Sequence, residues 1–204
     1  MQNVINRPLL SLFLAFAFFI TTPAVASGYG YKKPATVLDK LVQTDGAQAV
    51  VAAVLVVDEA GVLHFSLAEI LGDKNAEVVL FAPSNAAFEQ LLGLDPGTLN
   101  GLTIEQVKEA LPGLLPPGVG AGEVASILLK HVALPKRATL WTASDLALLE
   151  KGTVQVADES EFPVSVTASG VGVNYETTII RANINARNGV IHFIDTVILD
   201  GLLD

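Results

Sequence analysis

The sequence holds 204 residues, of which 51% are hydrophobic, and its 12 Lys and Arg against 21 Asp and Glu give a net charge of −9. This acidic balance argues against nucleic acid as a partner, because phosphate binding needs a basic stripe on the surface. The sequence contains no cysteine, which excludes disulfides, thiolate metal sites and lipid attachment through an N-terminal cysteine. Stability must therefore come from packing.

The first 26 residues have the layout of a secretory signal peptide. Arg7 precedes an apolar run from Leu9 to Ile20, and small residues follow up to an A-x-A site at Ala24–Ala26. A transmembrane helix needs roughly 20 apolar residues, so this run is too short to favour the alternative, an uncleaved membrane anchor. We expect cleavage after Ala26, export to the periplasm or the extracellular space, and no membrane insertion afterwards.

The mature chain begins with a helical half. Residues 27–35 are expected to form an exposed lead-in, after which the apolar positions from Val37 to Val42 recur at helical spacing. Residues 47–57 are apolar on nearly every side, which is typical of a helix buried deep in a fold. Three further helix starts are predicted by capping-box patterns at 66–69, 103–106 and 142–145.

A short buried strand is predicted between these helix starts. Residues 76–83 are apolar and rich in β-branched side chains, and Pro83 should end the strand. A helix follows, with Ser84 or Asn85 as its cap and Phe88 on its apolar face. Residues 112–122 concentrate proline and glycine between two helical segments, so we predict a surface loop there.

Beyond Lys151 the apolar residues alternate with a period of two. This pattern predicts strands within residues 153–158, 162–169, 171–175, 177–184 and 189–199. Asn188–Gly189 is a tight-turn signal that should join the last two strands. Runs of strands after runs of helices indicate an α+β domain.

The histidines are the first candidates for chemistry, because no G-x-S-x-G, H-E-x-x-H, P-loop or G-x-G-x-x-G motif is present. His192 and Asp195 fall on one predicted strand whose alternation turns them to opposite faces, so they cannot form a dyad. His131 lies on an apolar helical row, where a core histidine with a fixed hydrogen bond is the more frequent case. We therefore expect no catalytic residue, metal site or cofactor.

Two segments resemble the signatures of the fasciclin (FAS1) domain family. They are VVLFAPSNAAFEQLL at 78–92 and ANINARNGVIHFIDTVIL at 182–199, with ILLKHVAL at 127–134 similar to the family's central tyrosine–histidine segment. The resemblance implies a bacterial, secreted, single-domain member with its domain at 36–204. It implies an α+β wedge, in which a mixed, bent β-sheet packs with several short α-helices.

The resemblance also implies a noncatalytic module of cell adhesion or extracellular-matrix interaction. The expected partners are a surface protein, a polysaccharide or a second copy of the chain. Lys130 stands where family members often have tyrosine, which argues against integrin-type recognition. The candidates for partner binding are Lys130, His131, Leu114, Leu115 and Val119. The residues expected to act as architecture are Pro83, Ser84, Asn85, Phe88, Asn188, Gly189, His192 and Asp195.

Two alternatives stay open at this point. One is an exported carrier of a small apolar ligand or glycan, which would need a sizeable preformed cavity. The other is an exported metal-dependent hydrolase that uses His64, His131 and a carboxylate such as Asp195, and these side chains would have to converge in one pocket.

Overall fold

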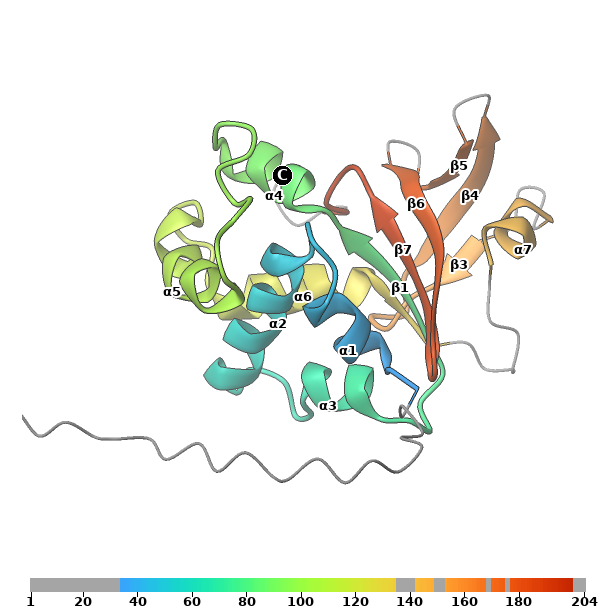
Figure 1. Ribbon diagram of the computed structural model, residues 1–204, viewed down its shortest axis with the longest axis horizontal. Helices are drawn as coiled ribbons and strands as arrows, with labels where there is room; N and C mark the ends of the chain where they lie inside the picture. Colours follow the sequence, from blue (N-terminus) through green and yellow to red (C-terminus); the bar gives the residue numbers. More distant parts are fainter. Residues whose placement is uncertain (1–33, 135–141, 149–152, 168–169, 175–176, 200–204) are drawn as a thin grey trace, which may run out of the picture. The chain divides into compact units, whose positions relative to one another are not determined.

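A computed structural model describes residues 34–134, 142–148, 153–167, 170–174 and 177–199, in which a helical layer packs against one face of a bent sheet (Figure 1). The helices are α1 (Val37–Val42), α2 (Gln48–Ala60), α3 (Leu67–Gly72), α4 (Asn85–Leu92), α5 (Ile104–Leu114), α6 (Ala121–Lys130) and α7 (Ala143–Leu148). The strands are β1 (Val78–Pro83), β2 (Val132–Ala133), β3 (Thr153–Gln155), β4 (Glu161–Thr167), β5 (Gly170–Val173), β6 (Thr177–Ala186) and β7 (Gly189–Ile194).

The sheet is mixed, which confirms the predicted fold class. Within the described residues its strand order is β2-β1-β7-β6-β5-β4-β3. β1 and β7 pair in parallel, from Val78 beside Gly189 to Pro83 beside Ile194, and the other strand pairs are antiparallel. The parallel pair brings the two signature segments side by side, although more than a hundred residues separate the end of β1 from the start of β7.

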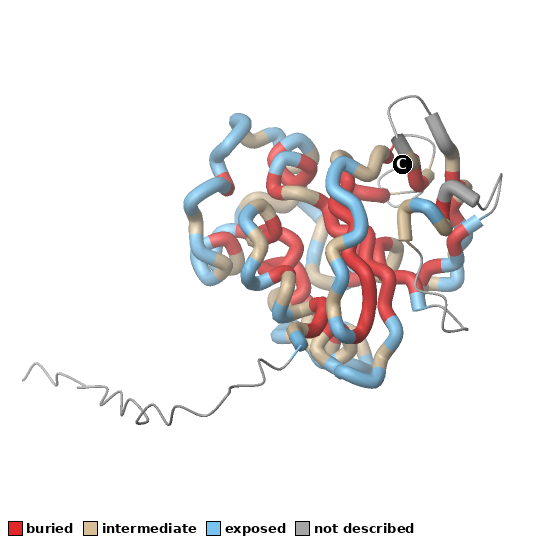
Figure 2. The backbone as a smooth tube through the Cα atoms, turned by 45° about the vertical axis from the view of Figure 1, so that its right-hand side comes forward, coloured by how far each residue is buried: buried red, intermediate tan, exposed pale blue. Residues whose placement is uncertain are grey.

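The central strands β1 and β7 are buried along their whole length (Figure 2). Their side chains alternate between two apolar clusters: Leu80 and Ile191 face the helices, whereas Phe81 and Ile194 face β3–β5 and α7. Strands covered on both faces read as continuous apolar runs, which is why 78–83 and 189–194 carry so few polar residues.

The helical layer is built around α2. Seven of its residues are buried, so the prediction of a deeply buried helix is confirmed, with the helix extending to Ala60. Three shorter helices begin at the predicted caps: Ser84 caps α4, and capping boxes open α5 at Thr103 and α7 at Thr142. Each cap satisfies amides of the first turn that have no partner inside the helix.

Four details of the prediction were wrong. α5 continues through Pro112 to Leu114, so the connection to α6 spans only 115–120 rather than 112–122. Pro112 has no N–H to donate to Lys108 O, so the helix lacks one hydrogen bond in its last turn and ends two residues later. β7 ends at Ile194, so Asp195 lies beyond the strand. The turn between β6 and β7 is Arg187–Asn188, with Gly189 as the first strand residue, and the short β2 was not predicted.

The start of α3 also differs from its prediction. Ser66 Oγ accepts the N–H of Glu69 as expected, but the amides of Leu67 and Ala68 donate to the carboxylate of Asp58, at 2.8 and 2.9 Å. Asp58 also accepts the hydroxyl of Ser66. The cap therefore comes largely from α2, eight to ten positions earlier in the chain, where a local sequence pattern does not reveal it.

Candidate functional site

Asn188 is the centre of a buried polar junction at the β6–β7 turn. Its side-chain oxygen accepts the N–H of Val37 at 2.8 Å, and its amide donates to the carbonyls of Leu71 and Asp73 at 3.1 and 2.9 Å. Its own carbonyl accepts the N–H of Val78. This one residue, 3% exposed, thus ties the start of α1 to the end of α3 by its side chain and holds the start of β1 by its carbonyl.

Gly189, the next residue, is required by close packing rather than by an unusual backbone angle. A β-carbon at this position would stand 1.9 Å from the carbonyl oxygen of Val78, on the neighbouring strand. Any side chain would push β7 away from β1, so only glycine fits. Asn188 and Gly189 therefore position the parallel strand pair.

The turn from β1 into α4 is held from both sides. The N–H of Ser84 donates to Ile194 O on β7, and the N–H of Asn85 donates to Gly46 O. The Asn85 side chain, 2% exposed, accepts the N–H of Ala49 at 3.1 Å and donates to Gln48 at 2.9 Å. Asn85 thus fixes the start of α2 against the start of α4.

Glu89 is a buried carboxylate that the sequence analysis did not single out. It is 3% exposed, and its two oxygens accept the N–H groups of Gly97 and Leu99 at 2.8 and 2.7 Å. Charge-assisted bonds of this kind satisfy a buried carboxylate without a cation. Glu89 therefore anchors the loop after α4. Its only sequence signal is a charge among the apolar residues of 86–92.

His131 is fully buried, so its side chain does not reach the surface and cannot contact a partner in this conformation. Its Nδ1 lies 2.7 Å from Ile127 O, and its Nε2 accepts the N–H of Ile198 at 3.0 Å. The proton therefore sits on Nδ1. Burial lowers the pKa of His131 to about 4, which keeps the ring neutral near pH 7.

His192 and Asp195 have separate surroundings. The His192 ring is fully buried and stacks on Phe81, with centroids 5.7 Å apart, and its Nδ1 lies 3.5 Å from the N–H of Asn183. Asp195 accepts the N–H of Thr178 at 2.8 Å, while its own N–H donates to Thr178 O. Both side chains therefore contact neighbouring strands of the sheet, His192 on β1 and β6 and Asp195 on β6.

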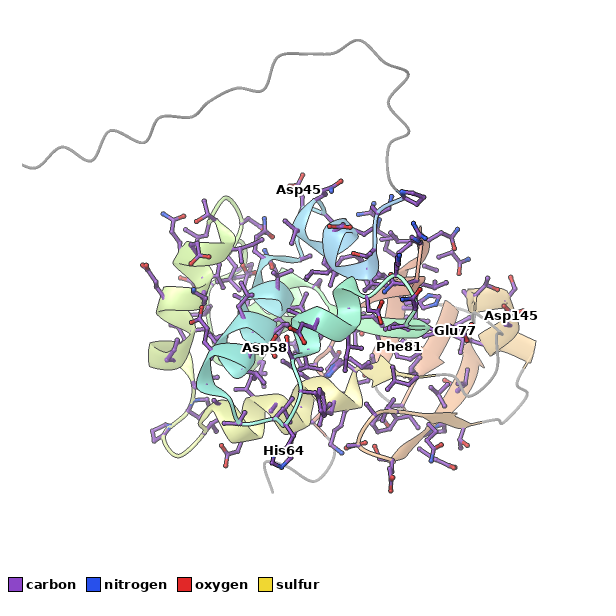
Figure 3. The ribbon with its side chains drawn as sticks, turned by 90° about the horizontal axis from the view of Figure 1, so that it is seen from below. Asp45, Asp58, His64, Glu77, Phe81 and Asp145 are labelled. Atoms are coloured by element: carbon purple, nitrogen blue, oxygen red, sulfur yellow. The ribbon has the colours of Figure 1, made fainter. Side chains whose placement is uncertain are left out.

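The residues of the hydrolase alternative occupy different environments. His64 is exposed on the loop between α2 and α3, and its side chain points outward (Figure 3). His131 has both ring nitrogens engaged by backbone groups, and Asp195 is held by Thr178. Among the residues that the structure describes, no group of three or more His, Asp or Glu side chains could hold a metal ion.

Lys130 is mostly buried, with 11% of its side chain exposed, and forms an ion pair with Asp158 at 3.1 Å. Its ammonium group lies 5.9 Å from the centroid of the Phe162 ring. Burial raises the pKa of the Asp158 carboxyl, but hydrogen bonds from Ser160 and the Lys130 ammonium bring it below its usual range. Lys130 thus joins the end of α6 to the β3–β4 hairpin.

The candidates near the α5–α6 connection are half-buried rather than free. Leu115 and Val119 pack against the core cluster, and Pro116, Pro117 and Gly118 between them are exposed. Leu115 also lines an apolar pocket of about 30 Å³ between α2, α4, α5 and α6. Pockets that bury whole small ligands measure roughly 300–1,000 Å³, so this pocket gives the carrier alternative no support.

Comparison with known proteins adds to this geometry. In the described part of the chain, no helix is both long and apolar enough to span a membrane. No curated protein matches the sequence. The Fasciclin domain model matches residues 60–200.

A solved structure of a FAS1 domain pair from the insect cell adhesion molecule fasciclin I has a similar fold. Its TM-score is 0.60 over 81% of this chain, at 17% sequence identity. The chain spans 51% of the length of that structure, and at this identity the likeness concerns the fold alone. Because the family model covers well over half of the residues, and β1 and β7 bring the two signature segments together, the chain belongs to the fasciclin domain family.

Proposed function

We propose that this protein is an exported, noncatalytic module that binds a surface protein, a polysaccharide or a second copy of itself. Fasciclin domains are generally noncatalytic adhesion modules and are typically extracellular or secreted. The observation that carries the proposal is that the buried polar side chains bind the protein's own backbone. Asn85, Glu89, Asn188 and His131 each bind backbone groups from other segments, which leaves the outer surface for recognition.

The exposed tip of the α5–α6 connection is the part of that surface that we assign to the partner. Pro116, Pro117 and Gly118 project between two half-buried apolar residues, and Val119 N–H closes a turn onto Pro116 O at 3.0 Å. Proline followed by a glycine of positive φ, here +92°, makes such a turn rigid. A rigid tip loses little conformational entropy when it binds.

A binding experiment tests this assignment. Immobilised protein is incubated with envelope and extracellular-matrix fractions of the producing cells, beside a Pro116→Asp/Pro117→Asp variant. A Pro96→Asp variant is the control, because Pro96 is also exposed on a loop. We expect the double variant to lose captured material and the control to retain it. Equal capture by all three proteins would remove the tip from consideration. Turnover of a captured component would contradict a noncatalytic role.

We also propose that residues 1–26 are a signal peptide, 27–35 a lead-in and 36–204 the domain. The support is Arg7 followed by the apolar run and the A-x-A site. The intact mass of the protein recovered outside the cytoplasm should match a chain that begins at Ser27. An uncleaved mass in the membrane pellet would favour an anchor instead.

A further inference from the structure

The sequence contains two Asn-Gly pairs, Asn100–Gly101 and Asn188–Gly189. In such a pair the backbone nitrogen of glycine can attack the side-chain carbonyl carbon of asparagine, because glycine has no β-carbon to obstruct the approach. The structure places the two pairs in opposite surroundings. We propose that Asn100 is a site of spontaneous deamidation and that the fold protects Asn188 from the same reaction.

Asn100 and Gly101 are both exposed, at the end of the loop that Glu89 anchors. The Leu102 N–H closes a turn over the pair by donating to Leu99 O at 3.4 Å, and Gly101 has a φ of +82°. No described residue hydrogen-bonds the Asn100 side chain or the Gly101 N–H. Nothing lies within 4 Å of the place where a β-carbon of Gly101 would stand. The attacking nitrogen and its target are therefore unhindered.

The side chain of Asn188, in contrast, is buried and hydrogen-bonded. It is 3% exposed, and its side chain makes three hydrogen bonds to backbone groups, one by the oxygen and two by the nitrogen. Gly189 lies against the carbonyl of Val78 on the neighbouring strand. Ring closure would require the side chain to leave all three partners and rotate inside a packed junction. Asn188 therefore reacts only when this part of the fold opens.

The chemistry needs water alone. The Gly101 nitrogen forms a bond to Cγ of Asn100 and loses its proton, while the side-chain nitrogen leaves as ammonia, which gives a cyclic succinimide. Water then adds to one of the two ring carbonyls. Opening on the side-chain side yields aspartate, and opening on the main-chain side yields isoaspartate, in which the backbone runs through the side chain. One water is consumed, one ammonia is released, and nothing is oxidised or reduced.

The two pairs form an internal control for the experiment. Purified protein is kept folded at mildly alkaline pH, beside a sample in denaturant, and peptides digested at acidic pH are sequenced by mass spectrometry. We expect Asn100 to convert at comparable rates in both samples, with isoaspartate among the products. Asn188 should convert in the denatured chain but at least about a hundredfold more slowly in the folded protein, because it must wait for opening.

Three outcomes would overturn the proposal. In the first, neither asparagine converts in the folded protein although both convert in the denatured chain. In the second, both asparagines convert at equal rates in the folded protein. In the third, Asn100 yields aspartate without isoaspartate, which would exclude the succinimide. An Asn100→Gln variant supplies a second test, because the longer side chain closes a less favourable ring. Its folded form should stop gaining acidic species during the incubation, and continued gain at the wild-type rate would place the reaction elsewhere.

Discussion

The interior junctions and the ion pairs of this protein stabilise it in different ways. Asn188, Glu89 and His131 are at most 3% exposed and bind backbone groups outside their own helix or turn. Lys130 and Lys108 instead pair with carboxylates near the surface. A buried backbone group that loses its partner stays desolvated, whereas an exposed ion regains water. The interior side chains should therefore matter far more, although they carry less charge.

The largest effect should come from Asn188→Ala. The substitution leaves Val37 N–H and Leu71 O without their partner, and it removes one of the two donors to Asp73 O, which keeps the N–H of Ala76. We expect a loss of about 3 kcal/mol in the free energy of unfolding, since each unsatisfied buried group costs roughly 1–3 kcal/mol. Denaturant titration followed by circular dichroism measures it. Asn185→Ala, on the exposed part of β6, is the matched control and should change stability little. Similar losses in both variants would contradict the junction.

His131 should make the fold sensitive to acid. The unfolded chain binds a proton near the ordinary pKa of 6.5, whereas the folded protein resists it until about pH 4. The stability associated with the neutral ring is therefore complete above pH 6.5 and falls as the pH is lowered towards 4. Linkage gives a loss of about 2 kcal/mol between pH 7.5 and 5.

Denaturant midpoints measured across this pH range test the effect. A His131→Gln variant should be less stable at pH 7.5 and should show a flatter pH dependence. His64→Gln, at an exposed position, is the control and should keep the wild-type slope. A His131→Gln variant with an unchanged slope would show that other groups cause the acid sensitivity.

Glu89→Gln should have an intermediate effect on the same scale. One oxygen can still accept the buried Leu99 N–H, but the new amide group faces the N–H of Gly97. Because Gly97 is exposed, its N–H can find water, and we expect a loss of about 1 kcal/mol. Hydrogen exchange measured on the variant and the wild type should show that the substitution accelerates exchange of the Gly97 N–H more than that of the Leu99 N–H. Exposed Gln90→Glu is the control on the same helix. Unchanged exchange at both amides would contradict the anchor.

The smallest effect should come from Asp158→Asn. The variant removes the ion pair with Lys130 but keeps an acceptor for Ser160. Lys130 is mostly buried, but its flexible stem can carry the ammonium group to water once the pair is broken, so we expect a loss of about 0.5 kcal/mol, reduced further by salt. A thermal melt at low and high salt measures it. A loss as large as that of Asn188→Ala would erase the distinction between the two regions.

Short-range sequence patterns were sufficient to predict most of the helices and strands. Thr103 and Thr142 mark helix starts with capping boxes, and 76–83 predicts the buried strand that is observed at 78–83, because these signals depend on residues a few positions apart. The same patterns misplaced the end of α5, because Pro112 was taken as the end of the helix, whereas the helix continues for two residues beyond it.

The long-range contacts could not be predicted in the same way. Asp58 caps α3 from α2, and the N–H of Ile198 reaches His131 across 67 positions. The residues next to each partner in the sequence do not indicate the contact, since only the folded chain brings the two segments together. His131 was expected to be a core histidine from its apolar helical row and was also named as a partner-binding candidate; its full burial agrees with the first expectation and contradicts the second. Glu89 was missed for a different reason: its partners at 97 and 99 are close in sequence but contribute only backbone N–H groups, which no residue type marks.

The parallel pairing of β1 with β7 also governs how the chain can fold. Val78 must wait for Gly189 and Asn188, which leave a ribosome or a translocation pore more than a hundred residues later. Until then the helices can form but the centre of the sheet has an open edge. Contacts this remote in sequence slow folding, typically to milliseconds or seconds. The sheet can therefore close only after the last strand is available.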